Sequence, residues 1–344
     1  MKQKDFFKEI VSLENLFSAW EEFEKGKKHK KDVMEFSLNL SENVYNLHQD
    51  LKNKTYTHGP YHAFNISDPK PRNIHKATVR DRLFHHAIYR VLYPHFDKKF
   101  IYDSYSCRKW KGTHSAMNRF RDFGRRVSQN NTKQCWVLKC DVRKFFASIN
   151  HEVLLSILKY HNLDPDTLWL LSQVISSFNT TNPNFISCDI SHDMKGLPLG
   201  NLTSQLLVNI YMNEFDQYVK QELKLKHYIR YADDFVVLSQ DKNYLTNILR
   251  YIAIYLKNNL KLKLHPNKVT IETLSSGADF LGFVHFPYHR VLRTSTKRRM
   301  KKKLQDNPSR EIVQSYLGLL SHGSTWGLKQ KFFSGILKVS VRGD

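Results

Sequence analysis

Two adjacent carboxylates, Asp233 and Asp234, stand between apolar runs in the segment YADDFVVL, residues 231–238. Like charges held this close repel each other and push one carboxyl group toward its neutral form. Asp is also an ordinary turn residue, so a solvated turn would account for the pair by itself. The alternative is a site for divalent cations, because bound cations would cancel the repulsion between the carboxylates.

A third carboxylate, Asp141, ends the apolar segment WVLKCD at residues 136–141. If this segment is a strand beside the one that carries Asp233 and Asp234, three carboxylates converge at one edge of a sheet. Two Mg²⁺ ions, or Mn²⁺ as a substitute, held by such a set promote in-line phosphoryl transfer. Mg²⁺ prefers a few carboxylates together with substrate phosphates, which fits this number of aspartates. The pattern predicts a nucleic-acid enzyme, either a polymerase or a nuclease.

The segments around the three aspartates predict an α+β fold, with one antiparallel sheet backed by helices. Aromatic and β-branched residues at 228–231 and 235–238 indicate two strands of a hairpin with Asp233 and Asp234 at its tip. Residues 136–141 and 278–286 are each expected to form a strand, and 262–272 a strand, a turn and a strand. Helices are expected over much of residues 1–57, at 151–160 after Asn150 as N-cap, and at 244–260.

The composition favours a polyanionic partner. The chain of 344 residues is 41% hydrophobic and carries a net charge of +22, which points to nucleic acid first and an acidic membrane second. No apolar run approaches the ~20 residues of a membrane span. The start of the chain lacks the pattern of a secretory signal, and the four cysteines form no CxxC pair. We therefore expect a cytoplasmic protein with reduced thiols and no structural zinc.

A basic segment, RVLRTSTKRRMKKK at residues 290–303, contains eight basic residues and no acidic one. A solvated charge run is the plain interpretation. Leu292, Met300 and Leu304 give the segment an apolar side, however, so that it can pack against the rest of the protein. We expect it to track the backbone of a nucleic-acid duplex, with a steep dependence on salt. The residues expected to contact the duplex are Arg293, Lys297, Arg298, Arg299, Lys301 and Lys302.

Several blocks of the sequence resemble those of reverse transcriptases, and they occur in the same order. The blocks are VRDRLFHHAIYRVL (79–92), SYSCRKWKGTHSAM (104–117), WVLKCDVRKFFASINHEVL, GLPLGNLTSQLLVNIYMNEFD, YIRYADDFVVL, LKLHPNKVTIE, ADFLGFVHF and SYLGLLSHG (315–323). The resemblance covers about residues 70 to 325. It implies a right-hand polymerase fold with fingers at 58–135, a palm at 136–288 with a fingers insertion near 165–195, and a basic helical thumb at 289–344. A helical extension, residues 1–57, precedes the fingers.

The resemblance also implies roles for single residues. Asp141, Asp233 and Asp234 would bind two Mg²⁺ ions, with a backbone carbonyl from Val142. Phe146 would exclude the 2′-hydroxyl of a ribonucleotide and so favour dNTPs. Phe145 and Phe146 would point opposite ways on a strand, and either could instead be a core aromatic.

Three basic residues are further candidates for contact with the nucleotide. Arg72 and Arg80 would grip the triphosphate or simply be solvated, and Lys268 would lie near the active site or in an exposed turn. The other partners implied are a template RNA and the RNA/DNA duplex.

The stretch LGNLTSQ, Leu199 to Gln205, indicates a subtype. Group II intron enzymes carry QGxxxSP at this place, whereas LGxxxSQ resembles the enzymes of diversity-generating retroelements. Leu199, Gly200 and Gln205 would contact the nucleotide. The resemblance implies error-prone cDNA synthesis at template adenines, together with a small basic helical accessory protein. A Leu beside the incoming base offers no hydrogen bond, so discrimination against a misaligned pair should be weaker than with Gln.

Three other functions remain open on the sequence. A defence-associated bacterial reverse transcriptase, which copies a dedicated non-coding RNA during antiviral defence, would have the same chemistry. An RNA-binding, maturase-like protein with a vestigial polymerase site is disfavoured by the intact Asp141, Asp233 and Asp234. A two-metal nuclease would have no need of Phe146 as a gate or of the LGNLTSQ loop.

Overall fold

The computed structural model describes residues 5–68, 70–180, 194–306 and 309–339 of the chain. The chain forms two compact units, each assembled from separate stretches of sequence. The first unit contains Met1–Cys107, Val142–Lys224 and Tyr251–Pro266, and the second unit contains Arg108–Asp141, Leu225–Arg250 and Asn267–Asp344. The chain passes from one unit to the other directly after Asp141. Among the described residues, no helix has both the length and the apolar character that crossing a bilayer requires.

The N-terminal helices of the first unit pack around one long helix, α5 (Val79–Asp97). They are α1 (Phe6–Val11), α2 (Leu13–Glu24), α3 (Lys31–Leu38) and α4 (Leu40–Lys52). The buried face of α2 carries Leu16 and Trp20, which the sequence places one turn apart. The Thr78 hydroxyl caps α5 by accepting a hydrogen bond from the Asp81 amide. The basic stretch between α2 and α3 is an exposed turn.

The rest of the first unit combines one hairpin with a helical layer. The hairpin joins β1 (His62–Ile66) to β2 (Arg72–Lys76). The helices are α7 (Phe145–Ser148), α8 (His151–Tyr160), α9 (Pro165–Ser176), α10 (Leu202–Gln217), a π-helical turn η1 (Tyr218–Glu222) and the end of α11 (Lys242–Leu260). Asn150 caps α8 by accepting a 2.9 Å bond from the Val153 amide, as predicted. Of the insertion expected near 165–195, residues 181–193 lie outside the described part of the chain.

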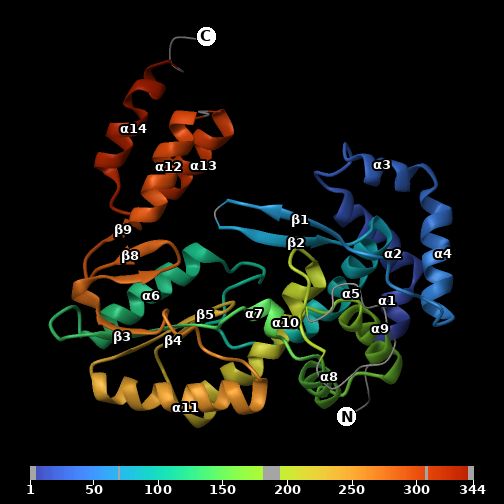
Figure 1. Ribbon diagram of the computed structural model, residues 1–344, viewed down its shortest axis with the longest axis horizontal. Coiled ribbons are helices and arrows are strands. Elements are labelled where there is room, and N and C mark those ends of the chain that lie inside the picture. The colour runs from blue at the N-terminus through green and yellow to red at the C-terminus, as the bar shows by residue number, and fades with distance from the viewer. Residues whose placement is uncertain (1–4, 69, 181–193, 307–308, 340–344) are drawn as a thin grey trace. The chain divides into compact units, whose positions relative to one another are not determined.

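A four-stranded antiparallel sheet forms the core of the second unit, in the order β4–β5–β3–β6 (Figure 1). Its strands are β3 (Trp136–Asp141), β4 (Tyr228–Tyr231), β5 (Asp234–Ser239) and β6 (Thr270–Thr273), and helix α6 (Thr113–Val127) packs against β4 and β5. Strands β3, β4 and β5 are largely buried, whereas residues of the edge strand β6 alternate between exposed and half-buried. The predicted α+β class, with an antiparallel sheet and helices, is confirmed.

The C-terminal part of the second unit differs from the prediction. Residues 278–286, expected to form one strand, form β7 (Ala278–Phe280) and β8 (Phe283–His285), because Leu281 and Gly282 adopt positive φ and reverse the chain. The helical segment expected from Arg290 begins with a third strand, β9 (Arg290–Leu292). The described residues thus form three sheets rather than one.

Three helices follow the small sheet β7–β8–β9. They are α12 (Thr294–Asp306), α13 (Arg310–Leu320) and α14 (Trp326–Val339) (Figure 1). Most of the basic segment lies on α12. Leu292 and Met300 are buried in one cluster with Phe283 and Leu320, and Leu304 packs on its edge. The apolar side that the sequence predicted for the basic segment therefore does attach it to a core.

Candidate active site

The hairpin β4–β5 presents the two adjacent aspartates. Tyr231 pairs with Asp234, so Ala232 and Asp233 form a two-residue turn and Asp234 is the first residue of β5 rather than part of the tip. Ala232 has a φ of 55°, the left-handed region that the turns of tight hairpins require. Beneath the turn, the fully buried guanidinium of Arg230 donates a 3.1 Å hydrogen bond to the Ala232 carbonyl.

The register of β3 and β5 brings the third aspartate to the same place. Asp141 is the Cα partner of Asp234, so the strand register places the two aspartates side by side. Burial, the charge of Asp233 and the nearness of Asp141 raise the pKa of Asp234 to about 6, against the opposing charge of Lys139. The predicted meeting of the acidic strand end with the hairpin is thus present in the structure.

The ammonium group of Lys268 forms an ion pair with Asp141. The Lys268 ammonium donates to both oxygens of Asp141, at 3.1 and 3.0 Å, and its side chain is 44% exposed. The sequence placed Lys268 near the active site, with an exposed turn as the alternative. The structure puts it in direct contact with Asp141, and β6 begins two residues later.

The carboxylates suit a divalent cation that arrives with a substrate. In the described part of the chain, no group of three His, Cys, Asp or Glu side chains is set as a complete metal site. Burial and the nearby charges of Asp233 and Asp141 nevertheless disfavour the ionised form of Asp234, which is what raises its pKa. A divalent ion would offset this repulsion, because Mg²⁺ is commonly held by one or two carboxylates together with substrate phosphates.

Val142 and Phe146 belong to the first unit. Val142 is buried and forms an isolated bridge with Leu264. The expectation of strand alternation at Phe145 and Phe146 was wrong, because Lys144 has a left-handed φ of 46° and starts the short helix α7. The two rings pack edge to face, with centroids 5.6 Å apart and planes at 79°, and Phe145 is buried while Phe146 is partly exposed.

The loop with Leu199 and Gly200 is bound to strand β2. The His75 amide donates to the Leu199 carbonyl at 3.1 Å, and the Asn201 amide group donates to the His75 carbonyl at 3.0 Å. Gly200 has a φ of +105°, and a Cβ there would lie 3.0 Å from a methyl group of Ile74, so the loop needs glycine at this position.

The other residues expected to bind nucleotide lie on three elements. Arg72 is exposed at the start of β2, and Gln205 is half-buried in the first turns of α10. Arg80, on α5, is held by Asp50 at 2.5 Å and stacks 4.8 Å above the Tyr56 ring, so it already has protein partners. Strand β2 connects two of the predicted positions, because it carries Arg72 and binds the loop of Leu199.

The basic residues of the C-terminal segment differ in their surroundings. Arg293 precedes α12 and forms an ion pair with Asp279 on β7, so its charge is matched within the protein. The remaining residues all lie on α12. Lys301, Lys302 and Arg298 are exposed, whereas Lys297 and Arg299 are half-buried.

Two contributors to the site were absent from the predictions. Arg230 supports the hairpin turn from beneath, and a lone Arg in the apolar run YIRY was the available signal. Asp279 neutralises Arg293, and nothing in the local sequence marks that pairing, since the partners lie on different elements.

Comparisons with known proteins identify the family of the chain. The family model described as reverse transcriptase (RNA-dependent DNA polymerase) matches residues 66–285. YkfC of Escherichia coli (strain K12) is 25% identical over 293 residues, which cover 74% of this chain and 72% of that protein. The group II intron-encoded protein LtrA of Lactococcus lactis subsp. cremoris is 22% identical over 398 residues, covering 92% of this chain and 63% of LtrA.

Solved structures resemble the chain in fold. A telomerase from Candida albicans, in complex with a fragment of telomeric RNA, matches with a TM-score of 0.52 and 14% identity over 83% of this chain. An apo telomerase from Candida tropicalis matches with a TM-score of 0.50 and 11% identity over 70% of this chain. The matched regions span 56% and 55% of those chains, and at such identity the likeness concerns the fold alone.

Proposed function

The chain belongs to the reverse transcriptase (RNA-dependent DNA polymerase) family, and from that premise we propose that it synthesises cDNA on an RNA template at Asp141, Asp233 and Asp234. Its enzyme class is that of an RNA-directed DNA polymerase. The observation that carries the proposal for the site is the pairing of Asp141 with Asp234 across β3 and β5, with Asp233 adjacent.

Each aspartate has a place in the proposed chemistry. Asp141 and Asp234 would hold divalent cations, with Asp233 and the Val142 carbonyl completing the set. When bound, such ions supply positive charge that activates the primer hydroxyl and stabilises the leaving pyrophosphate. The protein itself fixes the carboxylates through strand register, and Arg230 fixes the turn that carries Asp233.

Phe146 is proposed to select deoxynucleotides. Its ring is partly exposed, and the Phe146 carbonyl accepts a 2.8 Å hydrogen bond from the Leu197 amide, which ties the ring's backbone to the segment before Leu199. An aromatic ring held in this way would occupy the space that a ribose 2′-hydroxyl needs. Phe146→Val should therefore increase incorporation of NTPs relative to dNTPs.

A primer-extension assay tests the polymerase proposal. The purified chain, with a DNA primer on poly(rA) and Mg²⁺, should incorporate dTTP, and Asp233→Asn should abolish incorporation because the change removes a charge without changing shape. Asp122→Asn, on the exposed face of α6, is the matched control and should leave the rate unchanged. RNA binding without extension in any divalent ion would instead support a maturase-like binder.

We further propose that the enzyme is error-prone at template adenines, as in diversity-generating retroelements. The support is the position of Leu199 in a loop whose backbone is hydrogen-bonded to β2. Because this backbone is held in place, the type of side chain at position 199 would determine the contacts with the incoming nucleotide. A small basic helical accessory protein would be its partner in that setting. Leu199→Gln should lower misincorporation opposite adenine, measured by sequencing cDNA from a defined RNA, and an unchanged error spectrum would refute the role of Leu199.

A further inference from the structure

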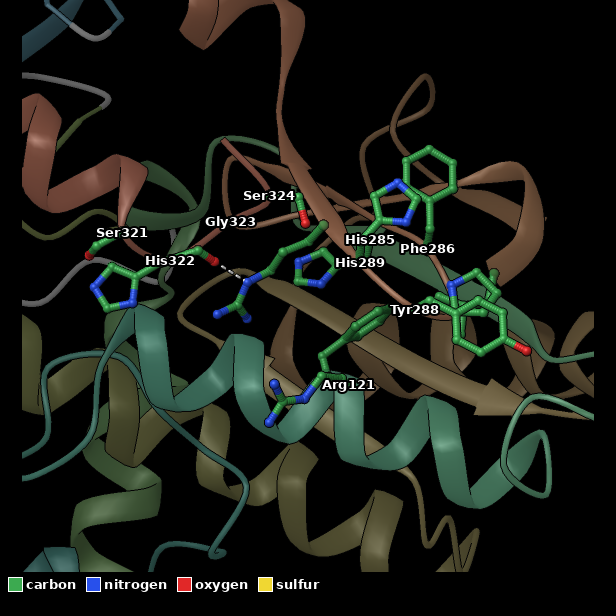
Figure 2. A pocket seen from close by; sticks show the side chains of 13 residues that line it. Arg121, His285, Phe286, Tyr288, His289, Ser321, His322, Gly323 and Ser324 are labelled. Atoms are coloured by element: carbon green, nitrogen blue, oxygen red, sulfur yellow. Dashed lines mark hydrogen bonds between the residues drawn. The ribbon is translucent and has the colours of Figure 1, made fainter. Parts of the chain in front are cut away.

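A pocket of about 280 Å³ lies within the second unit, apart from the aspartates. Figure 2 shows its labelled side chains coming from three segments: Arg121 from α6, His285 to His289 from the end of β8 and the turn before β9, and Ser321 to Ser324 from the loop after α13. Its volume is near the lower end of the range for small-molecule sites, roughly 300–1,000 Å³. That size suits one small ligand and not a helix or a duplex.

Arg290 joins the three walls of this pocket. Its Nε donates to the His322 carbonyl (dashed in Figure 2), its Nη2 donates to Asn118 on α6 at 3.1 Å, and its carbonyl accepts from the Ser324 amide at 2.8 Å. Gly323 fits closely here, because a Cβ would lie 3.1 Å from the Arg290 carbonyl. The pocket is therefore a built feature rather than a chance gap between loops.

The pocket carries positive charge and has no acidic residue among the thirteen that line it. The Arg121 guanidinium is about half exposed, and its carboxylate neighbour Asp122, at 3.7 Å, does not line the pocket. Arg290 has a buried Nη1 without a hydrogen-bond partner among the described residues. Burial and the charge of Arg121 both lower the pKa of Arg290, so an anion bound here would offset a repulsion that the protein leaves in place.

Flat rings form the other wall. The turn Phe286–His289 is closed by a 2.8 Å bond from the Phe286 amide to the His289 carbonyl, and the two rings stack with centroids 4.8 Å apart and planes at 13°. The Tyr288 ring, in the same turn, is 79% exposed. Aromatic rings beside Arg are the combination that binds unpaired nucleotides, since any base can stack and the phosphate meets the cation.

We propose that this pocket binds a single nucleotide, with its base stacked on the Phe286–His289 turn and its phosphate on Arg121. The ligand is a base joined to a phosphate, whether it is a nucleoside monophosphate in solution or one unpaired nucleotide of a bound RNA. The site goes beyond the polymerase function, because none of its residues is assigned to the active site or to the face of α12.

Photocrosslinking tests the proposal directly. The full chain is irradiated with an oligo(rU) pentamer that contains 4-thiouridine, and the adducts are mapped by mass spectrometry. We expect an adduct on the peptide that contains Phe286 to Arg290. Arg121→Ala should weaken binding at this site roughly ten-fold, and Tyr288→Ala likewise, because a stacked base contributes on that scale. Tyr288→Phe, which keeps the ring, should retain the adduct.

Matched variants control for exposure and charge. Tyr160, also 79% exposed, and Arg125, one turn after Arg121 on α6, lie outside the pocket, so Tyr160→Ala and Arg125→Ala should keep the adduct. Loss of the adduct on adding UMP identifies a free nucleotide as the ligand, and its persistence identifies the RNA. No adduct on this peptide, or equal yields in Arg121→Ala and Arg125→Ala, would overturn the proposal.

Failure of this site can be told apart from failure of the polymerase. On a fully paired poly(rA)–oligo(dT) substrate, Tyr288→Ala should extend primers at the rate of the unaltered protein. A loss of the adduct with full extension supports a separate nucleotide site, whereas a parallel loss of extension would show that the pocket is part of the catalytic machinery and would overturn its assignment as a separate site.

Discussion

At the scale of single residues, the acidic site is governed by its balance of charge. Asp141 pairs with Asp234 across β3 and β5, Asp233 adds a further negative charge, and Lys268 contacts both oxygens of Asp141. An ammonium in that position competes with any divalent ion that binds Asp141, because both need the same lone pairs. In the proposed metal site, the lysine would therefore set how tightly a metal is held before substrate arrives.

Removing this competitor should tighten metal binding. Lys268→Met is expected to increase the affinity of the protein for Mn²⁺ about five-fold, corresponding to roughly 1 kcal/mol for a partly exposed ion pair. Titration followed by electron paramagnetic resonance measures the unbound Mn²⁺. Lys263→Met, an exposed lysine of the first unit, is the control. Equal or weaker binding in Lys268→Met would show that the ammonium does not compete with the metal.

The three aspartates could be identified from the sequence, whereas the side chains that contact them could not. Strand patterns and apolar flanks placed Asp141 and Asp234 at strand ends, and their meeting followed only on the condition that the two strands are neighbours, as the family resemblance implies. The contact of Lys268 with Asp141 and of Arg293 with Asp279 depends on tertiary placement, which local patterns do not encode. The helical turn at Phe145 also escaped prediction, because Lys144 is not a residue type that signals a left-handed backbone.

At the scale of elements, a loop and a hairpin are joined by two hydrogen bonds. Leu199 and Asn201 bond the backbone of His75 on β2, and Asn201 is 3% exposed. Although Asn201 stands at the N-cap of α10, its side chain makes no capping bond and donates to the His75 carbonyl on β2 instead. The position of Leu199 thus depends on a strand distant in sequence, which the Gly/Pro composition of the loop could not reveal.

Asn201→Ala should loosen this connection. We expect the free energy of unfolding to fall by about 1 kcal/mol, because a buried hydrogen bond is removed, and the KM for dNTPs to rise as Leu199 becomes less ordered. Urea unfolding and steady-state kinetics measure the two effects. Asn73→Ala, which removes an exposed amide hydrogen bond on β2, should change neither. A comparable decrease in both variants would argue against a special role for Asn201.

At the scale of the whole molecule, net charge is the dominant property. A chain with a charge of +22 should bind RNA/DNA hybrid with affinity that falls steeply as salt rises, because bound phosphates release counterions. We do not expect every basic residue to contribute equally to binding of the hybrid. Lys301 and Lys302 are exposed on α12, whereas the charge of Arg293 is matched by Asp279.

A salt titration separates these two kinds of basic residue. The double variant Lys301→Gln, Lys302→Gln should flatten the slope of log affinity against log salt by about 1 to 2, since each phosphate that is no longer neutralised accounts for roughly 0.9. Arg293→Gln should leave the slope unchanged and lower thermal stability, because Asp279 is left without its partner. Fluorescence anisotropy of a labelled hybrid measures the slopes. Equal slopes in the two variants would contradict this division.

The buried guanidinium of Arg230 has one more consequence. Lys268 pairs with Asp141, and Arg230 holds the backbone of the turn that carries Asp233, so we expect β3, β4 and β5 to assemble before any metal is present. Metal-dependent activity and metal-independent folding should therefore separate in one experiment. Treatment with EDTA should stop DNA synthesis and leave the melting temperature where it was, unlike domains whose fold requires a bound ion. A marked fall in the melting temperature would show that these two cations are insufficient.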